Sequence, residues 1–257
     1  YDATAPTLSS VSIASNNSTT TLAKADDVVT LTLTASEAIA TPVVTFQSGG
    51  AAITDTSVTY TNTSGNTWTA AYTANASDTS GAVSYSIAFS DTAGNAGTAV
   101  TSGSGSVTFD TTDPTLSSVS IASNNSTTTL ALENDIVNLT FTASEPISTP
   151  VVTFNSGGAA ITDTSVTYTN TSGNTWTAAY TANASDTSGV VTFSIAFSDI
   201  AGNAGIAVIS GSGVVTASLD TTAPIISSVG LNSDNNALTV NFNESVYDTT
   251  NGNGDLE

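Results

Sequence analysis

Acidic side chains recur in three short motifs, and these motifs are the part of the sequence best suited to chemistry. D-x-T-x-P occurs at residues 2–6, 110–114 and 220–224, A-S-E at 35–37 and 143–145, and D-x-A-G-N at 91–95 and 199–203. Carboxylate and carbonyl oxygens are the ligands that calcium prefers in proteins. The candidate metal ligands are Asp2, Thr4, Glu37, Asp91 and Asn95 in the first copy, Asp110, Thr112, Asp113, Glu145, Asp199 and Asn203 in the second, and Asp220, Thr222 and Glu244 in the third.

The rest of the composition excludes most other chemistry. The chain has 21 Asp and Glu residues against one basic residue, Lys24, and it has no His and no Cys. It therefore lacks an imidazole base, a thiolate nucleophile and the usual ligands of zinc or copper. Nucleic acid and anionic membrane surfaces are poor partners, because nothing neutralises their phosphates. We expect no catalytic activity, and we expect no membrane insertion because no run of 18 apolar residues occurs.

Internal repetition divides the chain. Residues 7–22 recur without change at 115–130, and residues 41–81 recur at 149–189 with one change, Gln47 to Asn155. Repeats of about 100 residues are whole domains and are much longer than solenoid units. The sequence therefore predicts a first repeat at 1–109, a second at 110–219, and the beginning of a third at 220–257.

Each repeat alternates apolar and polar residues, which is the pattern of half-buried β-strands. We expect an all-β fold of tandem immunoglobulin-like Greek-key sandwiches arranged as a rod. The expected strands of the first repeat are 8–14, 27–36, 42–47, 56–62, 67–74, 82–90 and 98–109. Trp68 and Trp176 occupy matching places on one strand of each repeat and are expected in the core rather than on a sugar-binding surface.

The expected topology brings the acidic motifs together. In a seven-stranded sandwich, the start of the first strand, the end of the second strand and the loop after the sixth strand share one pole. Asp2, Glu37 and Asp91 should meet there. Carboxylates crowded together repel one another unless a cation balances them, so we predict Ca²⁺ at this pole of each domain. Backbone carbonyls near Thr4 or Thr112 are expected to complete the ligand shell.

Each motif also has an interpretation without metal. D-x-A-G-N is a good hairpin turn, because Asp and Asn favour such turns and Gly accepts positive φ, and D-x-T-x-P is a plausible linker. Asp113, where the other copies have Ala5 and Ala223, either adds a ligand or only adds charge. Asp78 and its repeat Asp186 fall at the opposite pole, where we expect solvated loop residues.

Together, the three motifs at intervals near 100 residues resemble the bacterial immunoglobulin-like (Big-type) tandem repeats of giant surface adhesins and biofilm-associated proteins. The resemblance covers both full repeats, and Phe242–Tyr247 resembles a somewhat different subtype. It implies that calcium at domain junctions stiffens a rod, with junctional roles for Asp110, Glu145 and Asp199. It also implies an extracellular location on a bacterial cell surface.

The leading functional prediction is a stalk, or extender, that holds a distal domain away from the cell, with the neighbouring repeats of the same chain as its partners. Two alternatives stay open. One is a self-assembling fibre or surface layer with lateral self-association, and the other is a module that binds a surface such as carbohydrate or ice. The last would suit a flat threonine array, although no single regular T-x-T ladder is repeated down the chain.

Overall fold

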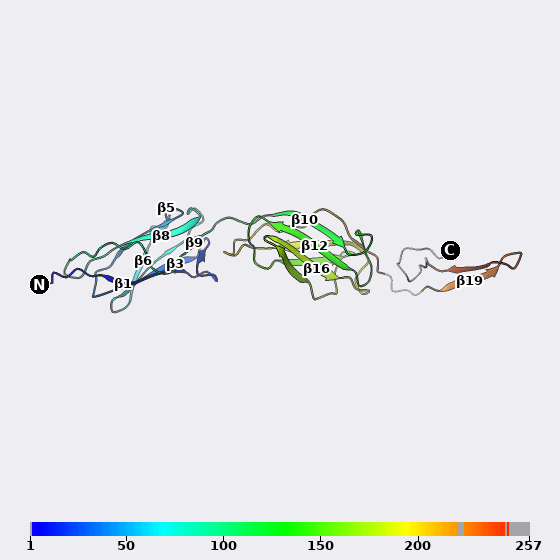
Figure 1. Cartoon of the computed structure of the whole chain (residues 1–257), viewed down its shortest axis with the longest axis horizontal. Coiled ribbons are helices and arrows are strands. Elements are labelled where there is room, and N and C mark those ends of the chain that lie inside the picture. Colours follow the sequence, from blue (N-terminus) through cyan, green and yellow to red (C-terminus); the bar gives the residue numbers. More distant parts are fainter. Residues whose placement is uncertain (1, 220–223, 245, 247–257) are drawn as a thin grey trace.

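The computed structural model describes residues 2–219, 224–244 and 246, and it consists of two β-sandwiches followed by a β-hairpin (Figure 1). The first sandwich contains β1 (Leu8–Ser15), β2 (Leu22–Ala23), β3 (Val28–Ala35), β4 (Val43–Ser48), β5 (Ala51–Ala52), β6 (Thr59–Ser64), β7 (Thr67–Thr73), β8 (Gly81–Ala88) and β9 (Thr108–Phe109). The second contains β10 (Leu116–Ser123), β11 (Leu130–Ala131), β12 (Ile136–Ala143), β13 (Val151–Ser156), β14 (Ala159–Ala160), β15 (Thr167–Ser172), β16 (Thr175–Thr181), β17 (Gly189–Ala196) and β18 (Thr216–Ala217). The hairpin is β19 (Ile226–Leu231) and β20 (Leu238–Phe242).

The strand order identifies the sandwiches as immunoglobulin-like. One sheet has the order β1-β3-β7-β6 and the other β2-β9-β8-β4-β5, and the second sandwich repeats both orders with β10–β18. The ladders between these strands are antiparallel except that β2 pairs with β9, and β11 with β18, in parallel. This is the arrangement in which strands A, B, E and D face strands C, F and G. The predicted all-β tandem fold is therefore confirmed.

The hydrophobic core of each sandwich is formed by the apolar residues that alternate with polar residues along the strands. In β3, Val29, Leu31 and Leu33 are buried, whereas the threonines between them face outward. Phe46 from the facing sheet contacts Tyr72, with ring centroids 4.8 Å apart. Trp68 is partly buried and packs against the same core, as expected from its place on the alternating strand.

The last expected strand is mostly irregular. Of the segment 98–109, only Thr108–Phe109 forms a named strand, and isolated bridges at Val100 and Ser104 hold the remainder against β8 and β1. Gly103 and Gly105 explain the close approach, because a Cβ at either position would lie 2.4 Å from a carbonyl oxygen of β1. The short strands β2 and β5 were not predicted.

Threonine side chains form rows across the outer face of the β1-β3-β7-β6 sheet. Thr34 is paired with Thr67 and Thr32 with Thr69, and Thr69 is also paired with Thr61 of β6. The hydroxyl groups of Thr34 and Thr67 hydrogen-bond to each other at 3.2 Å. The sequence has no regular T-x-T ladder along the chain. The register of neighbouring strands nevertheless places threonines side by side in a regular array across this sheet.

The β19–β20 hairpin has the same register as β1–β3. Ile226 pairs with Phe242 as Leu8 pairs with Ala35, and both ladders have an irregularity after the first pair. Asn243 accepts a hydrogen bond from the Ile225 N–H and donates its own N–H to the Ile225 carbonyl, which is the role of Ser36 opposite Thr7. Glu244 therefore lies at the position equivalent to Glu37.

Within the part of the chain that the structure describes, no helix is long and apolar enough to cross a membrane.

Candidate metal centres

Three carboxylates meet at the N-terminal pole of each sandwich. Asp2, Glu37 and Asp91 form one group, and each offers an oxygen within 4.8 Å of the other two. Asp110, Glu145 and Asp199 form the equivalent group in the second sandwich. Oxygens that share a calcium ion at 2.3–2.6 Å lie at most about 5 Å apart, so both groups have suitable dimensions. We call the first group the outer centre and the second the junction centre.

The D-x-A-G-N loop fixes one carboxylate of each centre. Asp199 accepts hydrogen bonds from the Gly202 N–H at 2.6 Å and the Asn203 N–H at 2.8 Å. Gly202 has φ +95°, a conformation that glycine adopts without strain. The turn interpretation of this motif is therefore correct, and the turn holds the Asp199 carboxylate at the pole.

The asparagine at the end of the D-x-A-G-N loop hydrogen-bonds to the D-x-T-x-P segment. The side-chain amide of Asn203 donates to the Asp199 carboxylate at 2.9 Å and to the Asp110 carbonyl at 3.1 Å. Asn95 makes the matching bonds to Asp91 and Asp2. In the structure these amides position two carboxylate-bearing segments, and their role as direct ligands stays a prediction. The hydrogen bond from the Asn95 side chain also holds the pKa of Asp91 below its usual range.

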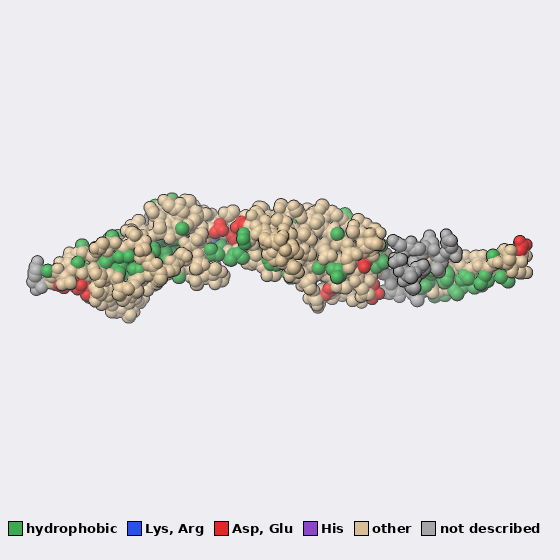
Figure 2. All heavy atoms as spheres, in the orientation of Figure 1, with side chains coloured by type: hydrophobic (Ala, Val, Ile, Leu, Met, Phe, Trp, Pro, Cys, Tyr) green, Lys and Arg blue, Asp and Glu red, His purple; other side chains and the backbone are tan. Residues whose placement is uncertain are grey.

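The junction centre lies where the two sandwiches meet. A cavity of about 180 Å³ is lined by its three carboxylates and by Leu22 of the first sandwich. Acidic atoms gather at the tip of the first sandwich and again between the two sandwiches (Figure 2). Asp2 is exposed, whereas its equivalent Asp110 is only partly exposed. The linker aspartate is therefore more covered at the junction centre than at the outer centre, while the other two carboxylates have matching burial in both.

Burial and like charge act on Glu145 at the junction. Its pKa is raised above the ordinary value of 4.5, first by burial and then by the charges of Asp110 and Asp199. Lys24 is the one basic residue of the chain, and although its aliphatic stem lies against Gly202, it forms no ion pair with these carboxylates among the described residues. No ion pair therefore balances the negative charge of this centre, and a bound cation would stabilise it.

This pKa gives a pH-dependent prediction for the chain in EDTA. A carboxyl group with a raised pKa in the folded state binds its proton more readily when folded. Its stabilising effect is complete below the unfolded pKa, and it is lost as pH rises through the folded one. We expect the free energy of unfolding of the second sandwich to rise as pH falls from neutral towards 4.5.

Urea unfolding at a series of pH values would measure this, and Glu145→Gln should remove the rise. Asp91 does not interfere, because its pKa is lowered from 3.8 and it titrates below this range. An equal rise in wild type and in Glu145→Gln would contradict the prediction.

The other predicted ligands are distributed as follows. Thr4 and Thr112 each donate their N–H to the preceding motif aspartate at 2.9 Å, so they shape the linker beside the centres. Asp113 is exposed and is not among the three carboxylates that meet at the junction centre. Asp220 and Thr222 lie outside the described residues, and Glu244 is placed at the end of β20.

The expectation for Asp78 and Asp186 was wrong. Their side chains are 5% and 7% exposed, so they are buried rather than solvated. Asp186 accepts hydrogen bonds from the Thr162 N–H at 2.6 Å, the Thr162 hydroxyl at 2.7 Å and the Asn183 N–H at 3.0 Å. These aspartates organise loops at the far pole of their own domain.

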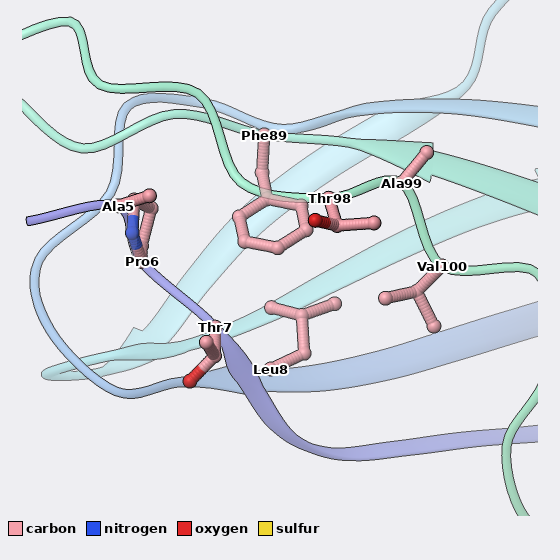
Figure 3. Close-up of a pocket in the computed structure, with 8 residues that line it drawn as sticks. All are labelled: Ala5, Pro6, Thr7, Leu8, Phe89, Thr98, Ala99 and Val100. Carbon is pink, nitrogen blue, oxygen red and sulfur yellow. The ribbon is translucent and has the colours of Figure 1, made fainter.

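A second cavity lies on the first sandwich, between the start of β1 and the segment after β8 (Figure 3). Its volume is about 260 Å³, and Pro6, Leu8, Phe89 and Val100 are among the residues that line it. No lining residue carries an acid, a base or a nucleophilic thiol. The cavity offers mostly apolar surface, and its threonine hydroxyl groups have no acid or base beside them among the lining residues to activate them.

Sequence reasoning missed the residues of the first sandwich that reach the junction. Asn17 donates its side-chain amide to the carbonyl of Ala201 at 2.9 Å, and Leu22 lines the junction cavity. Asn17 lies in the loop after β1 and Leu22 in the short strand β2, and this segment carries no acidic motif in common with the centres. No signal in the sequence links this loop to residues 199–203.

Comparison with known proteins finds only distant structural similarity. No protein-family model matches the chain, and no curated protein matches it. A three-Ig fragment of titin in an E-to-A mutated variant is 12% identical over 88% of this chain and 69% of that one, with a TM-score of 0.41. The titin Z1Z2 domains in complex with telethonin are 17% identical over 84% and 96% of the two chains, with a TM-score of 0.28. Such distant similarity carries no functional argument, and the fold assignment rests on strand order.

Proposed function

We propose that this chain is part of a structural stalk in which calcium at the domain junction limits bending between consecutive sandwiches. The observation that carries the proposal is the junction centre. Three carboxylates from the linker, from the end of β12 and from the loop after β17 meet there, beside a residue of the preceding domain. A cation held by all three would join the linker to the body of the second domain.

The donor set suits calcium. All three side chains offer oxygen, and the sequence contains no His or Cys to favour a transition metal. Calcium accepts six to eight oxygen ligands in flexible geometry, so carbonyl groups and water would complete the shell. When bound, the ion would supply positive charge where Asp110, Glu145 and Asp199 otherwise repel one another.

The wider setting is part of the same proposal. The near-identity of the two repeats and the resemblance to Big-type repeats support a bacterial surface adhesin as the source, with an extracellular location. A spacer needs length and stiffness rather than a different site in each unit, which suits neighbours that are nearly identical. We also propose that the chain is not catalytic, and the lack of an acid, a base or a thiol among the residues that line the Figure 3 cavity supports this.

The test measures bending directly. The chain has no Cys, so Thr61→Cys and Thr169→Cys place one spin label on the exposed β6 and one on the exposed β15. We expect the distribution of label–label distances, measured by pulsed electron paramagnetic resonance, to be narrow with calcium and broad with EDTA. The reason is that the ion fixes the linker that joins the two labelled sandwiches.

Matched variants locate the effect. Asp199→Asn at the junction should keep the distribution broad in calcium, whereas Asp91→Asn at the outer centre should leave the narrowing intact. Equal distributions with and without calcium in wild type would refute the calcium-stiffened stalk. Sedimentation velocity on the same samples distinguishes the stalk from the alternative of a self-assembling fibre. A stalk should remain a monomer at all concentrations tested, whereas a fibre should form larger species as the concentration rises.

A further inference from the structure

The two centres are nearly identical in sequence, yet their surroundings differ. Ala93, in the loop of the outer centre, is exposed, whereas its equivalent Ala201 is only 4% exposed. The loops D-T-A-G-N and D-I-A-G-N differ at a single position. The covering of Ala201 therefore comes from the preceding sandwich and not from the loop itself.

Asn17 makes the central contact. Its side-chain amide has two N–H groups, and one donates to Asp27 of its own loop at 2.7 Å while the other donates to the Ala201 carbonyl at 2.9 Å. Its side-chain oxygen accepts the Thr19 N–H at 3.0 Å. Asn17 is 9% exposed, and with these bonds each polar atom of its side chain has a partner.

Lys24 lies beside this contact. A Cβ built on Gly202 would be 3.3 Å from Lys24 Cε and 3.5 Å from Cδ, so the aliphatic stem of the lysine lies over the glycine. Glycine is suited to this close approach because it has no side chain. The corresponding residue of the second repeat is Leu132, which is 39% exposed.

The second sandwich contains a natural reference for Asn17. Asn125 donates to Asp135 at 2.8 Å and accepts the Thr127 N–H at 2.9 Å, so it repeats the bonds of Asn17 within its own loop. Among the described residues no carbonyl from a following domain accepts its second N–H. The contact across the junction is the difference between the two asparagines.

We propose that residues 16–27 of the first sandwich form a docking surface for the 199–203 loop of the second, and that docking through Asn17 and cation binding at the junction centre strengthen each other. The two events share one loop. Asp199 at its start is a carboxylate of the centre, and its oxygens hold the Gly202 and Asn203 N–H groups. A cation that fixes Asp199 thereby fixes the loop conformation that presents Ala201 to Asn17.

This inference rests on the proposed function and adds a partner to its site. Coupling between two binding events is reciprocal, so the preceding domain must raise cation affinity by the same factor as the cation raises docking. The consequence is an unequal pair of sites. Within the described residues the junction centre has a preceding sandwich against it, so in this 257-residue chain it should bind calcium more tightly than the outer centre, although the two carry the same carboxylates.

The test is calcium titration by calorimetry in the full chain carrying Asp91→Asn, which leaves the junction centre as the intact one. Asn17→Ala should weaken calcium binding roughly two- to tenfold, the effect of losing one hydrogen bond. Asn125→Ala removes the same bonds within a loop of the second sandwich and should leave the affinity unchanged. A second pair of variants enlarges the native alanine of each D-x-A-G-N loop. Ala201→Leu should weaken calcium binding, and Ala93→Leu should leave it unchanged.

The outcomes distinguish failure of this inference from failure of the proposed function. If Asn17→Ala and Asn125→Ala bind calcium equally well, or if Ala201→Leu behaves as Ala93→Leu does, the coupling is refuted while the junction centre stands. If neither the Asp91→Asn chain nor the wild type binds calcium, the proposed function fails and the coupling fails with it. Urea unfolding of each variant verifies that both sandwiches remain folded.

Discussion

Saturating calcium is expected to raise the thermal unfolding midpoint of the second sandwich by roughly 10–20 °C relative to EDTA. An ion that binds only the folded state stabilises it by about 2.7 kcal/mol at a concentration 100 times its Kd. Each kcal/mol shifts the midpoint of a domain of about 100 residues by about 4–8 °C. Scanning calorimetry of the full chain measures the shift and resolves the two sandwiches when their transitions differ.

Variants at the junction decide whether the shift comes from this centre. The double variant Glu145→Gln with Asp199→Asn should lose the calcium-dependent shift of the second sandwich while the first sandwich keeps its own. The asparagine retains an acceptor for the loop N–H groups that Asp199 binds, so the loop loses little else. Asp113→Asn is the control for charge, because Asp113 is exposed and lies outside the cluster.

The double variant and Asp113→Asn give distinguishable results. A full shift in Asp113→Asn means that this residue only adds charge to the linker, and a lost shift means that it is a ligand. A full shift in the double variant would show that calcium acts elsewhere on the chain. The acidic motifs would then be turns and linkers alone.

The second large effect is expected at the opposite pole of the second sandwich from the junction centre. Replacing the buried Asp186 with Ala should lower the free energy of unfolding of the second sandwich by about 3 kcal/mol, because hydrogen bonds to charged groups are strong and their donors would lose a partner. The carboxylate accepts three such bonds, two from Thr162 and one from Asn183. Its replacement therefore frees a threonine side chain and two loop N–H groups.

Asp163→Ala is the matched control. Asp163 lies in the same domain and accepts the N–H groups of Ser165 and Thr181, but it is more exposed, so water can replace its bonds. We expect it to cost about 1 kcal/mol. Urea unfolding monitored by Trp176 fluorescence in chains that also carry Trp68→Phe, with calcium present throughout, measures both. Equal losses in the two variants would mean that burial of Asp186 has no special role.

Alternation and repetition were sufficient to predict the sandwich and its acidic pole. Strands with a period of two residues bury Val29, Leu31 and Leu33 on one face wherever they occur. Once seven strands form a Greek-key sandwich, their order places the linker, the end of the second strand and the loop after the sixth at one end. The approach of Asp110, Glu145 and Asp199 follows from that topology, because each residue lies in a segment that adjoins a strand at this pole.

Only the tertiary structure decided how the pole is covered and which carboxylates are buried. Asn17 and Ala201 are 184 residues apart, and their contact depends on how two separate domains approach one another. Asp186 is buried because the chain around Thr162 folds over it, which its own neighbours in sequence do not indicate. Local patterns determine strands and turns through backbone geometry, whereas loop packing and domain docking depend on surfaces that exist only after the strands have assembled.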